Sequence, residues 1–109
     1  MDQRQQWGTP FYNSGAGASG SVTITRTAVV GRAHKVTDIS GSVTTNSTAV
    51  IELSSSGTIF WQDRIGDSAY RKEFVVPISI PTGSAITLVV NRGDGGGTAY
   101  GNMSGYFVG

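Results

Sequence analysis

Few residues in this chain of 109 could carry out chemistry. His34 is the only histidine and there is no cysteine, which excludes a Cys-His nucleophile and a thiolate metal site. A Ser-His-Asp triad would have to use His34, yet no nucleophile-elbow motif accompanies it. A single histidine beside a lysine at the start of a strand is usually a surface residue, so we expect His34 to be exposed and without a chemical role. We predict that the protein is not an enzyme.

Acidic residues offer the only other candidate site for an ion. Asp63, Asp67 and Glu73 could approach one another and present oxygen ligands to Ca²⁺, but their spacing matches no calcium-binding loop. Basic residues that could pair with them lie nearby: Arg64, Arg71 and Lys72. A structural zinc site requires about four Cys, His or carboxylate ligands. We therefore expect solvated, paired charges, with no metal and no cofactor.

The glycine-rich segment 93–97 follows a strand and does not open onto a helix. The helix-terminal N–H groups that cradle a phosphate are therefore missing, and we predict an exposed loop that binds no nucleotide. Arg92-Gly93-Asp94 also spells a tripeptide used by cell-adhesion ligands, but a three-residue match is common by chance.

Composition excludes further classes. A net charge of +1 with scattered basic residues lacks the clustered basic face that nucleic-acid binding needs. No run of about 18 apolar residues could span a membrane, and no signal peptide is visible, so we expect synthesis in the cytoplasm and no membrane partner. With 38% hydrophobic residues, the chain should form one folded domain over residues 21–109.

A period of two dominates residues 73–91, where apolar side chains alternate on both sides of Pro81-Thr82-Gly83-Ser84. Alternation of this kind predicts two strands joined by a short loop. Pro77 cannot donate a ladder hydrogen bond, so its strand should lie at a sheet edge or be bulged there.

The rest of the chain continues the pattern of short strands. We expect strands over 22–30, 34–44, 49–53, 58–65 and 100–108, with a hairpin turn at residues 54–57 and a β-bulge between Val36 and Ile39. Seven or eight short strands without a helix predict an all-β fold, an antiparallel β-sandwich or jelly roll. The predicted core comprises Ile51, Leu53, Ile59, Trp61, Phe74, Val76, Ile78, Ile80, Ile86, Leu88 and Val90.

Residues 1–20 are interpreted as an N-terminal arm with a glycine-rich hinge. Three aromatic residues, Trp7, Phe11 and Tyr12, precede the run from Asn13 to Gly20. Either they reach a neighbouring subunit, or they fold back onto the domain's own core as a short edge strand. On the first interpretation, the candidate partner-binding residues are Gln3, Trp7, Phe11 and Tyr12.

Several stretches carry a resemblance: residues 36–42, Ile59-Phe60-Trp61, the segment from Pro81 to Leu88, and Met103-Ser104-Gly105-Tyr106. In this order they are similar to the jelly-roll decoration proteins, also called cement or staple proteins, of tailed bacteriophages. The resemblance implies a virion structural protein on the outer capsid surface that bridges major capsid protein subunits.

We also expect self-association, as a dimer in preference to a trimer, because an exposed edge strand is a template for pairing. A trimer is the second possibility, since the Ser-Gly-Tyr-Phe ending resembles the last strand of trimeric jelly rolls of the tumour-necrosis-factor and complement type.

The alternative function is a carbohydrate- or receptor-binding module of a phage tail fibre. Aromatic residues would then stack on sugar rings, and the candidates are Trp7, Tyr12, Trp61, Tyr70 and Tyr100. Aromatics exposed on one rigid face would favour sugar binding, whereas aromatics on an arm or in a dimer contact would favour capsid stapling.

Overall fold

The computed structural model describes residues 9–18, 20–44, 49–65, 69–92 and 97–108. These residues form eight β-strands and no helix, which confirms the predicted all-β fold. The strands are β1 (Thr9–Gly17), β2 (Ser21–Arg26), β3 (Ala33–Val43), β4 (Ala49–Ser55), β5 (Thr58–Ile65), β6 (Tyr70–Ile80), β7 (Ile86–Asn91) and β8 (Ala99–Val108).

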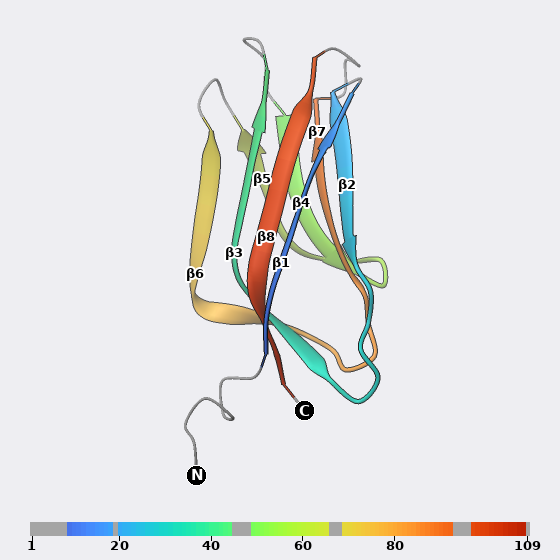
Figure 1. The fold of residues 1–109 in the computed structure, drawn as a ribbon. Helices are drawn as coiled ribbons and strands as arrows, with labels where there is room; N and C mark the ends of the chain where they lie inside the picture. The colour runs from blue at the N-terminus through green and yellow to red at the C-terminus, as the bar shows by residue number, and fades with distance from the viewer. Residues whose placement is uncertain (1–8, 19, 45–48, 66–68, 93–96, 109) are drawn as a thin grey trace.

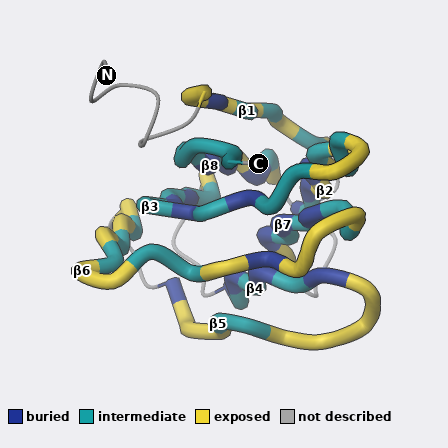
Figure 2. The backbone as a smooth tube through the Cα atoms, turned by 90° about the horizontal axis from the view of Figure 1, so that it is seen from below, coloured by how far each residue is buried: buried dark blue, intermediate teal, exposed yellow. Residues whose placement is uncertain are grey.

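The strands make two antiparallel four-stranded sheets, in the orders β1-β8-β3-β6 and β2-β7-β4-β5. Successive strands cross from one sheet to the other except at the β4–β5 hairpin, so the first and last strands are neighbours in one sheet. This order is that of a jelly roll. The two sheets pack face to face, and the buried segments lie between them (Figures 1 and 2).

The core follows from the period-two pattern. In β4 and β7 every second residue is buried, because successive side chains of a strand point to opposite faces of the sheet. Six predicted core residues are fully buried: Ile51, Leu53, Ile80, Ile86, Leu88 and Val90. Three others, Trp61, Phe74 and Ile78, are partly buried against this core.

A wide bulge in β6 overturns one part of the predicted core. Val36 of β3 pairs with Ile78 whereas Asp38 pairs with Glu73, so four residues of β6 lie opposite a single residue of β3. β6 turns sharply along its length (Figure 1), and Val76 is 79% exposed. Its assignment to the core is therefore wrong, but the bulge and the edge position of this strand confirm the prediction made from Pro77.

Ile59 is the second error in the predicted core, because it is 52% exposed. Leu53 pairs with Trp61 whereas Ser54 pairs with Ile59, so Phe60 is an extra residue in β5. This bulge turns Ile59 from the core face to the solvent face of the sheet. The β4–β5 turn itself is confirmed at Ser56 and Gly57, which both have positive φ (51° and 82°), as a two-residue type I′ hairpin turn requires.

The run expected to be a hinge belongs to a strand. Residues 9–17 pair one to one with residues 107–99 of β8, so the hinge prediction is wrong over Asn13–Gly17. A Cβ at Gly17 would lie 1.9 Å from the carbonyl oxygen of Ser21. Glycine is needed there because β1 and β2 approach closely. For residues 9–17 the alternative of a short edge strand is the one observed.

Gly105 provides a first testable prediction, because a Cβ there would lie 2.0 Å from the carbonyl oxygen of Lys35. A Gly105→Ala substitution must push β3 and β8 apart, and we expect it to lower the free energy of unfolding by about 1–3 kcal/mol. Urea denaturation measures this, with Ser42→Ala on the solvent side of β3 as the control. Equal stability of Gly105→Ala and the parent chain would contradict the close approach.

Candidate functional site: the solvent face of the β1-β8-β3-β6 sheet

The outward side chains of β1, β8 and β3 are mainly tyrosine, serine and asparagine. They come from residues that alternate with the buried ones along each strand. We call this surface the tyrosine face, and it comprises Tyr12, Ser14, Lys35, Asp38, Ser40, Ser42, Tyr100, Asn102, Ser104 and Tyr106. Strand pairing aligns these residues in rows: Tyr12 lies opposite Ser104, which in turn lies opposite Asp38.

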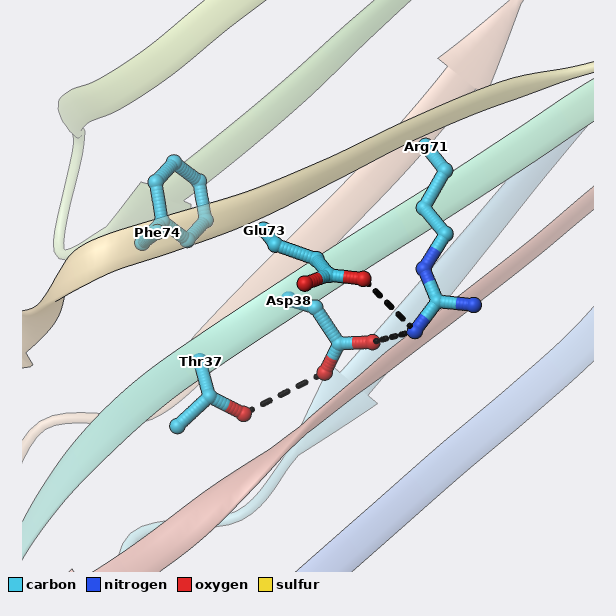
Figure 3. Close-up of a pocket in the computed structure, with 5 residues that line it drawn as sticks. All are labelled: Thr37, Asp38, Arg71, Glu73 and Phe74. Atoms are coloured by element: carbon cyan, nitrogen blue, oxygen red, sulfur yellow. Dashed lines mark hydrogen bonds and ion pairs between the residues drawn. The ribbon is translucent and has the colours of Figure 1, made fainter.

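Three hydrogen bonds fix the carboxylate of Asp38 at the centre of this surface. Its Oδ1 accepts hydrogen bonds from the hydroxyl of Thr37, at 3.2 Å, and from that of Ser104. Its Oδ2 accepts one from Nη2 of Arg71 at 3.4 Å, and the same guanidinium lies 3.2 Å from Glu73. Figure 3 shows the three charged groups side by side. Asp38 is thereby held in one orientation by groups from three strands.

A shallow hollow of about 300 Å³ opens beside this network, and its lining residues are Thr37, Asp38, Arg71, Glu73 and Phe74 (Figure 3). The side chains of Arg71 and Glu73 are 66% and 72% exposed, so their ion pair contributes little to stability. These charged groups are therefore available to a binding partner at little cost to the fold.

Two tyrosines of the tyrosine face are exposed to solvent. Tyr12 is 64% exposed and Tyr100 is 46% exposed, while Tyr106 is half-buried. Tyr106 lies opposite Pro10, which makes it a diagonal neighbour of Tyr12. Tyr100 lies four residues along β8 from Ser104, at about 13 Å. The aromatic side chains are thus spread along the sheet and do not converge on one hollow.

The prediction that His34 lies at the surface is wrong, because the residue is only 1% exposed. Its ring lies between Phe11 and Phe107, with centroid distances of 5.4 and 5.6 Å. Arg26 donates a hydrogen bond to Nε2 of His34 at 3.5 Å, whereas Nδ1 of His34 has no hydrogen-bond partner among the described residues. Burial, and next the positive charge of Arg26, lower the pKa of His34.

A second aromatic cluster closes the gap between β5 and β6. Trp61 donates a hydrogen bond to the hydroxyl of Tyr70 at 2.9 Å, and Tyr70 donates one to Asp63 at 3.0 Å. Phe74 packs edge-on against the Trp61 ring, and Lys72 lies over that ring. Burial and the carboxylate of Asp63 raise the pKa of Tyr70 and outweigh the lowering by Trp61. Trp61 and Tyr70 thus contact each other at the side of the sandwich, away from the tyrosine face.

The four predicted partner-binding residues separate in the structure. Gln3 and Trp7 lie outside the described residues. Asp67, a member of the acidic cluster considered for Ca²⁺, lies outside them as well. Phe11 is 6% exposed and belongs to the core, so its ring is not accessible to a partner in this structure. Tyr12 is exposed beside it, and its role in binding stays a prediction.

Within the described residues, no group of three or more His, Asp or Glu side chains is placed to hold a metal ion. The same part of the chain contains no helix that is long and apolar enough to cross a membrane. Comparisons with protein-family models, with curated proteins and with solved structures find no match.

Proposed function

We propose that the protein is a non-enzymatic structural protein that decorates a bacteriophage capsid and bridges its major capsid protein subunits through the tyrosine face. The observation that carries this proposal is that exposed Tyr12 and Tyr100 stand on paired strands among small polar side chains. Tyrosine with serine and asparagine is the composition of antibody binding loops, in which tyrosine supplies rigid contact area and the small polar residues supply hydrogen bonds.

The rigidity of the surface supports this function. The residues of the tyrosine face lie on strands, and Asp38, Ser40 and Asn102 are held by hydrogen bonds across the sheet. A preordered surface loses little conformational entropy on binding, so more of the contact energy appears as affinity. Many copies on a repeating shell would increase the effective affinity further. The choice of a capsid as the partner follows the sequence resemblance.

We expect a Tyr100→Ala variant to bind expanded, undecorated phage heads about 30-fold more weakly, since loss of an anchoring aromatic costs about 2 kcal/mol. Co-sedimentation of purified protein with heads over a concentration series measures this. Thr23→Ala is the matched control, because Thr23 is exposed on the solvent side of β2, in the other sheet.

The outcome that would contradict this prediction is equal binding by Tyr100→Ala and the parent chain. Removal of the N-terminal segment is a poor substitute for this test, because a chain beginning at Ser19 lacks β1 and the buried ring of Phe11. Loss of binding by such a chain would report damage to the sheet.

A second candidate function is carbohydrate or receptor binding, as in a tail-fibre module. It is favoured by the position of Tyr12, Tyr100 and Tyr106 on one rigid face, since successive sugar rings of an extended glycan could stack on spaced aromatics. Retention on a glycan array that Tyr100→Ala abolishes, together with no sedimentation with heads, would favour this function over decoration.

A further inference from the structure

We propose that the free edge of β1 pairs antiparallel with β1 of a second copy, so that the two four-stranded sheets join into one continuous sheet across a two-fold axis. The tyrosine faces of both copies would then form one surface. The inference concerns self-association and does not depend on what the tyrosine face binds.

The position of β1 leaves one of its edges open. β1 is the outer strand of its sheet, and among the strands that the structure describes it pairs only with β8. Figures 1 and 2 both show β1 and β2 diverging from the connection between them. Arg26, the last residue of β2, still reaches the side chains of Phe11 and Asn13 on the first half of β1, but it does not pair with the β1 backbone. In an antiparallel pair, alternate residues direct their backbone N–H and C=O groups away from the partner strand. These groups of β1 are available to another strand.

The other outer strand of the same sheet is poorly suited to pairing. β6 carries the wide bulge opposite Thr37 and the imino residue Pro77, and three successive charged residues, Arg71, Lys72 and Glu73, precede the bulge. Bulges, proline and charges are the devices by which natural edge strands avoid pairing.

The outer strands of the second sheet are protected or short as well. β5 has a register shift against β4, and its exposed residues Asp63 and Arg64 place charged side chains at this edge. β2 has six residues and ends at Arg26. A long, regular strand is what edge-to-edge pairing requires, and neither strand offers one.

β1 has the features that the other three edges lack. Its nine residues include no charged side chain, and each of them pairs with β8 without a register shift. Pro10, next to the start of the strand, and the glycines near its end, where β2 approaches Gly17, depart from an ideal edge. Two identical segments that pair antiparallel are related by a two-fold axis, which is the commonest symmetry of homo-oligomers. A second copy of β1 is therefore the strand that this edge fits.

The experiment places opposite charges on the edge in two separate variants, Tyr12→Lys and Tyr12→Glu. Sedimentation velocity of the parent chain above micromolar concentration should show a dimer. Each variant alone should dissociate at least about fivefold more readily, because the two like charges become close neighbours across the paired strands. An equimolar mixture of the two variants should regain the dimer. Tyr100→Lys is the control, because Tyr100 is exposed on the same face but lies on β8, an interior strand.

Three results would overturn the proposal: a monomeric parent chain at the highest concentration, a mixture that dimerises no better than either variant, or a Tyr100→Lys chain that dissociates as readily as Tyr12→Lys. The last result would indicate packing of the faces and not of the edges. Hydrogen exchange provides an independent measurement, since β1 amides should exchange more slowly as the concentration of the parent chain rises.

Discussion

Replacing Leu88 by alanine is expected to lower the free energy of unfolding by about 2–5 kcal/mol, through lost transfer energy and the cavity left behind. Leu88 is fully buried at the centre of β7, and it pairs with Ile24 on one side and with Leu53 on the other. Strands on both sides hold the surrounding backbone, so the site cannot collapse to fill the space. Chemical denaturation followed by circular dichroism measures the loss.

Val76→Ala is the informative control for this substitution. Both residues belong to the same alternating pattern in the sequence, yet Val76 is 79% exposed on the β6 bulge. Its truncation should change the free energy of unfolding by no more than about 0.5 kcal/mol, as for most surface substitutions. A large loss for Val76→Ala together with a small one for Leu88→Ala would contradict the position of the bulge.

His34→Ala is expected to have a comparable effect, about 2–5 kcal/mol by analogy with truncation of other fully buried side chains. Its ring fills the space between Phe11 on β1 and Phe107 on β8, so its removal leaves a cavity where the first and last strands meet. The sequence predicted an exposed His34 without a chemical role, and its burial reverses the expectation of exposure. Equal stability of His34→Ala and the parent chain would contradict this burial.

The same residue should make stability depend on pH. Because its pKa is lowered in the folded protein, the unfolded chain binds the proton more readily. Above about pH 6.5, the ordinary histidine pKa, the contribution of His34 to the free energy of unfolding should not change with pH. Below about pH 6.5 this contribution should fall until the pH reaches the lowered pKa of the folded protein. His34 is the only histidine, so a His34→Phe variant should lose this dependence. A parent chain without any decline in that range would argue against a buried neutral ring.

Much of the fold was accessible from the sequence because alternation is a direct consequence of strand geometry. The β5 bounds of Thr58–Ile65 and the bulge between Val36 and Ile39 agree with the structure. The errors arise where pairing changes register. Val76 and Ile59 continue the apolar alternation, but bulges turn them outward, and the size of a bulge depends on the partner strand, which a single sequence does not identify.

The candidate site was less accessible. Gly15 and Gly17 suggested a hinge, since glycine permits both flexibility and close packing, and only the neighbouring β2 shows that close packing is its role here. Tyr12 and Tyr100 lie far apart in the sequence and share a face because β1 pairs with β8. His34 carried one usable signal, because it lies two residues before the buried Val36 and therefore in the inward phase of β3.

The pairing of β1 with β8 has a consequence for how the chain reaches this structure. Thr9 must find Phe107, near the other end of the sequence, and closing a loop of that length costs entropy before any contact repays it. Folding should therefore take milliseconds to seconds, as in other β-sandwiches. Among the described strands, β1 is synthesised before all the others and β8 after them. This sheet can therefore be completed only once β8 has been made, and until then β1 lacks the strand with which it pairs.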